Sequence, residues 1–106
     1  MRATKKDLPV AAETPAFTSR QAEWGTHSVD FTTVKGGTDF TEPFSQMPGG
    51  SCQTPHWGYV IKGRLRIKYA DHEEVLSAGD AYYLLPGHVP VVEDDSELIE
   101  FSLVGD

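Results

Sequence analysis

The 106-residue sequence contains a single cysteine, Cys52, so no internal disulfide can form. Basic residues are also scarce, because nine Lys and Arg stand against sixteen Asp and Glu and give a formal net charge of −7. Nucleic-acid binding depends on a positively charged surface, which this chain lacks. The sequence therefore predicts no DNA or RNA partner.

Long apolar runs are absent as well. No stretch approaches the roughly 20 apolar residues that span a bilayer, and the N-terminus lacks the apolar core of a signal peptide. We therefore expect a cytoplasmic protein without a membrane partner. No window of eleven or more residues keeps helical apolar spacing without a Gly or Pro, which argues against long helices.

Short strand patterns recur along the chain instead. In the clearest one, Leu65, Ile67 and Tyr69 alternate with basic residues, as in a strand with one face in water. Residues 64–76 are expected to form a hairpin with a polar tip at residues 71–72. Further strands are expected at residues 29–34, 40–44, 56–61, 81–85 and 97–103.

Many short strands separated by turns favour a sandwich or a closed barrel, because closure removes exposed edges. The chain has room for one domain. Residues 1–23 are expected to form an N-terminal arm or edge segment, followed by a barrel of residues 24–106. The continuously apolar run at 81–85 is expected to be buried on both faces.

Two glycine-led motifs lie in the middle of the sequence. Gly63 is followed by the strand Arg64-Leu65-Arg66-Ile67, and Gly79-Asp80 leads to Pro86-Gly87-His88. Together with Ser51-Cys52-Gln53 and His56-x-Gly58-Tyr59-Val60, these motifs resemble a group of small single-domain bacterial cupins. The resemblance covers about residues 36–103. It implies an all-β fold, the RmlC-like double-stranded β-helix or jelly-roll barrel.

The chain departs from the cupin metal motif, which supplies His-x-His, a Glu and a later His. By spacing, His56 occupies the position of the Glu, Cys52 that of the second His and Gly50 that of the first. The later His would fall at Pro90, whereas a histidine occurs two residues earlier, at His88. Two of the four usual ligand positions therefore hold residues able to bind a metal.

Cys52 and His56 share one face of an extended segment, and in a cupin that face lines the barrel interior. A thiolate and an imidazole suit Zn²⁺, Ni²⁺ or Fe²⁺, but two ligands are too few for a durable site. The candidate for a third ligand is His88 at the barrel mouth, with Glu42 or His27 from the preceding strands as remoter alternatives. We expect either one divalent transition metal, zinc, nickel or iron, or no cofactor.

Each candidate also has a purely structural alternative. Cys52 is equally consistent with a small buried hydrophobe, His56 with a hydrogen-bonded polar histidine, and His88 with a turn cap. A Cys52 nucleophile with His56 as base is a further alternative, but no glycine-rich oxyanion motif accompanies it. Gly58 is expected to leave space above His56 for a small molecule.

Aromatic residues on two of the expected strands divide between the faces. Tyr82 and Tyr83 point to opposite sides of their strand, so one of them is expected to face the pocket, and both are candidate ligand-binding residues. Trp57 and Tyr59 alternate with His56 and are expected outside the cavity, in a homodimer interface.

We expect the chain to bind a small molecule in the barrel interior, with or without a divalent metal. The alternative is a metal-dependent enzyme, an oxygenase or isomerase acting on a small organic acid or sugar derivative. A third possibility is an interaction protein whose acidic run at residues 93–97 docks a partner, although such a run is more often a solvated loop.

Overall fold

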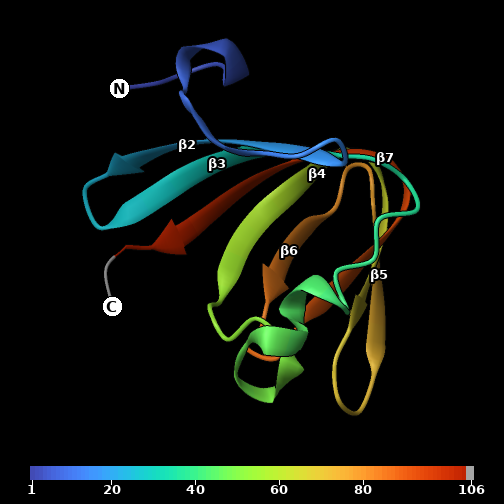
Figure 1. Cartoon of the computed structure of the whole chain (residues 1–106). Coiled ribbons are helices and arrows are strands. Elements are labelled where there is room, and N and C mark those ends of the chain that lie inside the picture. The colour runs from blue at the N-terminus through green and yellow to red at the C-terminus, as the bar shows by residue number, and fades with distance from the viewer. Residues whose placement is uncertain (105–106) are drawn as a thin grey trace.

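The computed structural model describes residues 1–104, which fold into one all-β domain around a bent antiparallel sheet (Figure 1). This confirms the predicted fold class. No helix within residues 1–104 has the length and apolar character that a membrane crossing requires. Three short 3-10 turns are present: η1 (Lys5–Asp7), η2 (Pro43–Gln46) and η3 (Pro48–Gly50). The strands are β1 (Val10–Glu13), β2 (Phe17–Trp24), β3 (His27–Val34), β4 (His56–Lys68), β5 (Glu73–Ser77), β6 (Ala81–Leu84) and β7 (Val89–Leu103).

The strand order is β1-β2-β3-β7-β4-β5, and β6 also pairs with β4. The two longest strands change neighbours along their length: residues 56–59 of β4 pair with β6, and residues 64–68 pair with β5. β7 pairs with β4 and, from residue 96 onward, also with β3. Figure 1 shows β4 and β7 curving from the layer of β2 and β3 toward β5. They therefore join the two layers of the barrel.

β4 bends at Gly63, between the segments that pair with β6 and with β5. The β4–β7 register is irregular between Val60 and Leu65, and Gly63 has a φ of 99°, in the left-handed region that favours glycine. A β-carbon built on Gly63 would lie 2.5 Å from the carbonyl oxygen of Asp95 on β7. A residue without a side chain is therefore needed where the two long strands cross between the layers.

The core lies between the two layers, and we call the faces that line it the inner faces. Leu65 and Ile67 are buried while Arg64 is exposed, so the predicted alternation is confirmed. Burying an aliphatic side chain of this size contributes about 1.5–3 kcal/mol. The core comprises Val34, Val60, Leu65, Ile67, Leu76, Tyr82, Leu84, Val92 and Leu98.

The prediction of a strand at residues 40–44 is wrong. Pro43 starts η2, and the backbone N–H of Phe44 donates to the carbonyl of Phe40 at 2.9 Å. Proline at the first position of a helical turn is favourable because its φ is already fixed and its missing N–H has no partner to lose. The apolar spacing survives in the turn, because Phe40 packs against the core and its ring lies 5.4 Å from that of Phe44.

The prediction that residues 81–85 are buried on both faces is also wrong. Tyr82 and Leu84 are buried, but Tyr83 is 45% exposed and Leu85 is 47% exposed. Only the inner face of β6 meets the core, and its outer face belongs to an aromatic surface described below.

Regular structure is present in the first 23 residues. β1 lies at one edge of the sheet, whereas β2 pairs with β3 along its whole length. Leu8 is 4% exposed, and its carbonyl accepts a hydrogen bond from Arg20 of β2 at 3.1 Å. Lys5 of η1 forms a 2.6 Å ion pair with Glu97 of β7. The N-terminal segment is thus held against the outside of the layer formed by β2, β3 and β7.

Candidate functional site

Three metal-ligating side chains meet at one end of the barrel. Cys52 lies in the loop before β4, His56 is the first residue of β4, and His88 lies in the turn between β6 and β7. Each offers one ligand atom, and the three atoms all lie within 4.8 Å of one another. The structure therefore brings together the three residues that the sequence analysis selected as metal ligands.

Backbone hydrogen bonds hold the two loops of this cluster together. The N–H of Cys52 donates to the carbonyl of His88 at 3.0 Å, and the N–H of Gly87 donates to the carbonyl of Cys52 at 2.8 Å. Gly87 has a φ of 96°, which glycine adopts without strain. The turn and the loop are consequently fixed relative to each other by their main chains.

His88 is oriented by a contact on the side of its ring that faces away from the cluster. It is 2% exposed, and its Nδ1 lies 2.7 Å from the carbonyl oxygen of Leu85. A carbonyl only accepts hydrogen bonds, so Nδ1 carries a proton, and in the neutral imidazole Nε2 then carries the lone pair. This arrangement resembles the way metal-bound histidines are positioned through their second nitrogen.

His56 contacts both a serine and the cysteine. Its Nδ1 lies 2.5 Å from the hydroxyl oxygen of Ser102 on β7, and its Nε2 lies 3.8 Å from Sγ of Cys52. The hydrogen bond with His56 lowers the pKa of the Cys52 thiol, and partial burial opposes this shift. The histidine therefore favours the thiolate, which is the metal-binding form of cysteine.

The cluster opens onto a cavity of about 140 Å³ between the two layers. Its walls are mainly apolar and aromatic, and Glu100 is the only carboxylate among the residues that line it. The lining residues are Thr32, Val34, Phe40, Phe44, Cys52, His56, Leu65, Ile67, Leu76, Tyr82, Leu84, His88, Pro90, Val92, Leu98 and Glu100.

Tyr82 and Glu100 meet across Gly58. Gly58 of β4 lies between Tyr82 of β6 and Glu100 of β7 in the register, and the tyrosine hydroxyl donates to Oε1 of Glu100 at 2.8 Å. A β-carbon built on Gly58 would lie 2.5 Å from Cζ of Tyr82. The prediction that Gly58 leaves space for a small molecule is therefore wrong, because the Tyr82 ring fills that space.

The second predicted tyrosine lies elsewhere. Tyr83 is on the outer face of β6, where its ring stacks on Trp57 at 5.3 Å, so the structure does not bring it to the cavity. Trp57 and Tyr59 are 40% and 45% exposed, which confirms that they lie outside the cavity.

The two remoter candidates for the third ligand lie away from the cluster. The ring of His27 packs at 6.3 Å against the ring of Trp57, on the outer face. Glu42 precedes η2 and lines a separate shallow pocket with Asp39 and Ser45.

Sequence reasoning missed Glu100 and Ser102. Both lie on the inner face of β7, where they follow buried Leu98 at intervals of two residues. That period was visible in the sequence, but the residues they contact depend on how β7 pairs with β4.

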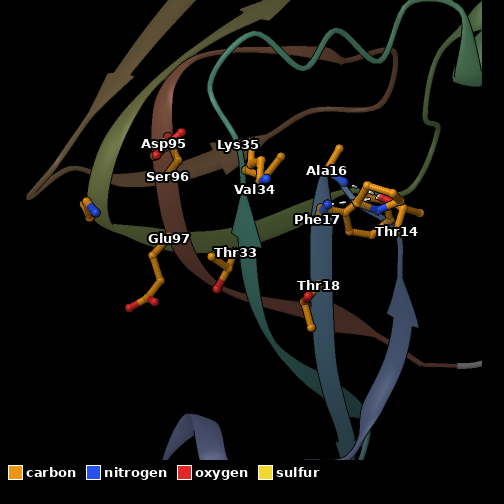
Figure 2. Close-up of a pocket in the computed structure, with 12 residues that line it drawn as sticks. Thr14, Ala16, Phe17, Thr18, Thr33, Val34, Lys35, Asp95, Ser96 and Glu97 are labelled. Carbon is orange, nitrogen blue, oxygen red and sulfur yellow. Dashed lines mark hydrogen bonds between the residues drawn. The ribbon is translucent and has the colours of Figure 1, made fainter.

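A separate cavity of about 280 Å³ lies beside the ends of β2 and β3, near residues 95–97 of β7 (Figure 2). Figure 2 shows the Thr14 hydroxyl accepting the backbone N–H groups of Ala16 and Phe17 and the Glu97 side chain pointing away from them. Its lining contains neither cysteine nor histidine, so the inner cavity is the stronger candidate site.

No family model matches the chain, and no curated protein matches its sequence. Solved structures do match. An RmlC-like cupin from Shewanella frigidimarina NCIMB 400 is 13% identical with a TM-score of 0.69. The match covers 97% of this chain and 89% of the cupin chain.

Two further structures carry functional names. Ectoine synthase from P. lautus is 14% identical with a TM-score of 0.71, over 97% of this chain and 77% of its own. KdgF from Halomonas sp. is 19% identical with a TM-score of 0.67, and the match covers 97% of this chain and 93% of KdgF. At these identities the likeness concerns the fold alone. The chain therefore has the cupin fold.

Proposed function

We propose that the chain binds one divalent transition metal through Cys52, His56 and His88, and a small molecule in the cavity behind them. The convergence of these three donors at the mouth of the cavity carries the proposal. One thiolate and two imidazoles suit zinc, nickel or iron. Three protein ligands would leave a coordination position open, as in catalytic rather than structural zinc sites.

The distance between the donor atoms of Cys52 and His56 is compatible with a shared zinc ion. In a tetrahedral zinc site, bonds of about 2.3 Å to sulfur and about 2.0–2.1 Å to nitrogen place the two ligand atoms about 3.5 Å apart. The Sγ–Nε2 distance between Cys52 and His56 is 3.8 Å, so only a small adjustment is required. Ser102 and the Leu85 carbonyl would then hold the far nitrogens of the two histidines.

The alternative function is a metal-dependent enzyme, an oxygenase or isomerase acting on a small organic acid or sugar derivative. The open coordination position favours it, since a substrate oxygen could bind the metal there and be polarised. Ectoine synthase, an enzyme by its name, has a similar fold. When bound, the metal would supply Lewis acidity, and the protein would supply an enclosed, mainly apolar cavity.

Elemental analysis of protein purified without an affinity tag tests the metal site. We expect near-stoichiometric zinc, nickel or iron in the wild type and its loss in His56→Ala. His72→Ala is the matched control, because His72 lies on the exposed β4–β5 turn and should not affect metal content. Metal-free wild-type protein whose melting temperature does not change with any of the three ions would overturn the proposal.

We also propose a homodimer formed through the outer face of β6, β4 and β7. Tyr83, Trp57 and Phe101 are consecutive cross-strand neighbours there, and each is at least 36% exposed. Aromatic side chains are enriched in protein interfaces, and a two-fold axis would place the same surface on both partners. Location in the cytoplasm stays a prediction from the sequence.

A further inference from the structure

The cavity has a strong asymmetry of charge. Its lining contains Glu100 but no Lys or Arg, and among residues 1–104 Glu100 forms no ion pair. A carboxylate in a mainly apolar cavity is stabilised when an opposite charge lies beside it. An anionic group such as a phosphate would instead meet repulsion from Glu100 without a basic side chain to bind it.

One oxygen of the Glu100 carboxylate is available to a ligand. Oε1 accepts the hydroxyl proton of Tyr82, and within the described chain Oε2 accepts no hydrogen bond. Tyr82 is itself 8% exposed, and its ring packs directly over the backbone of Gly58. The tyrosine therefore fixes the position of the carboxylate. The cross-strand neighbour of Glu100 on β3 is another acidic residue, Asp30. Its carboxylate accepts hydrogen bonds from Ser19, Gln21 and Thr32, all of which are neutral.

A second unpartnered atom lies at the mouth of the same cavity. His88 is 2% exposed, and its Nε2 has no hydrogen-bond partner among residues 1–104. The ligand-binding space is thus bounded by an electron-pair donor cluster at the mouth and by a carboxylate on the inner face of β7.

The volume limits the size of what can bind between them. An engineered cavity of about 150 Å³ accommodates benzene, which has six heavy atoms. The cavity here is about 140 Å³, so a ligand enclosed by it has about six or seven heavy atoms.

We propose that the ligand of this cavity is a short amino acid with its amine at the end opposite its carboxylate. Its ammonium group binds Glu100, and its carboxylate oxygen takes the open position of the metal held by Cys52, His56 and His88. This inference rests on the proposed metal site and adds the class of molecule that binds there. A carboxylate oxygen is a common zinc ligand, and an ammonium group donates charge-assisted hydrogen bonds to a carboxylate.

Calorimetric titration of the zinc-loaded protein with two matched pairs of acids tests this inference. β-Alanine and butyrate each have six heavy atoms, and 4-aminobutyrate and pentanoate each have seven. The two members of each pair differ only at the end opposite the carboxylate, where one has an amine and the other a methyl group. We expect the amine-bearing member of at least one pair to bind at least about tenfold more tightly, as a hydrogen bond to a charged group allows.

Glu100→Gln should remove this preference while keeping an acceptor for the Tyr82 hydroxyl. Glu97→Gln is the matched control, because Glu97 lies on the same strand but pairs with Lys5 on the outside of the barrel. The zinc content of each variant establishes that it is folded and loaded before titration.

The outcomes separate the two proposals. Equal binding within both pairs, no binding of any of the four acids to zinc-loaded protein, or an amine preference that persists in Glu100→Gln would overturn the inference and leave the metal site intact. If the protein takes up none of zinc, nickel and iron, the proposed function fails instead. The same pairs titrated into metal-free protein then decide whether Glu100 selects amines.

Discussion

At the level of single residues, the Tyr82 hydroxyl lies away from water, because the tyrosine is only 8% exposed and its hydroxyl donates to Glu100. Burial and the neighbouring Glu100 carboxylate raise the pKa of Tyr82 far above its ordinary value of 10.0. In the unfolded chain the same phenol ionises near pH 10. The folded protein therefore keeps a proton that the unfolded chain releases in alkaline solution.

The sign of the resulting pH dependence is fixed. Above about pH 10 the unfolded state binds fewer protons than the native state, so the free energy of unfolding falls as pH rises. Urea denaturation between pH 7 and about pH 11 should show a steeper alkaline loss of stability in the wild type than in Tyr82→Phe. Tyr83→Phe, which alters the outer face, should retain the steep loss. Parallel curves for the wild type and Tyr82→Phe would contradict the burial described here.

The site could be predicted from the sequence only in part. Cys52, His56 and His88 were selected because motif spacing and donor chemistry are properties of the sequence itself. Glu100 and Ser102 were missed because their roles depend on partners across the sheet. A strand pattern says that two residues share a face, but not which residues of a distant strand lie beside them.

At the level of secondary structure elements, the bend in β4 depends on Gly63. An alanine at this position would be strained by the left-handed backbone conformation, and its β-carbon would clash with Ser96 and the Asp95 carbonyl. Gly79 has nearly the same φ, 95° against 99°, but a β-carbon built on it meets nothing within 4 Å. The two glycines therefore separate backbone strain from steric overlap.

Gly63→Ala should lower the free energy of unfolding more than Gly79→Ala. We expect backbone strain of about 1–2 kcal/mol in both variants and about 1–3 kcal/mol more in Gly63→Ala from overpacking. Chemical denaturation of the two variants beside the wild type measures both costs. Equal losses would mean that β7 moves away from Gly63 freely and that the crossing is not tightly packed.

Strands with clear alternation were predictable, and those with mixed signals were not. The hairpin of β4 and β5 followed from alternating Leu65 and Ile67 and from its polar tip. The run at residues 40–44 failed because Pro43 selects a turn whatever the apolar spacing around it. β6 is apolar on both sides because one side meets the core and the other forms part of an exposed aromatic surface.

At the level of the whole molecule, the outer aromatic face should determine the oligomeric state. Light scattering on the wild type should give twice the chain mass of 11.7 kDa. Phe101→Lys should give the mass of one chain, because a buried lysine without a partner charge is costly. Val75→Lys is the control, since Val75 is exposed on β5, away from this face. A wild-type mass of one chain would rule out the proposed dimer.

The class of the fold was predictable, whereas the path of the chain through it was not. Turn spacing and short alternating runs favour a closed β-structure in many possible strand orders. The position of β7 between β3 and β4 joins residues far apart in the sequence, such as Val29 with Phe101. Only the resemblance to cupins reduced those orders to one.

Main-chain atoms alone join the Cys52 loop to the turn at Gly87 and His88. Peptide N–H and C=O groups are the same for every residue type except proline, so this join does not depend on the side chains that the two loops carry. Substitutions at positions 52 and 88 can therefore change the donor atoms while the main chain that carries them stays in place. The rim of the cavity is thus a backbone frame on which the type of donor side chain can differ without a change in the strands of the barrel.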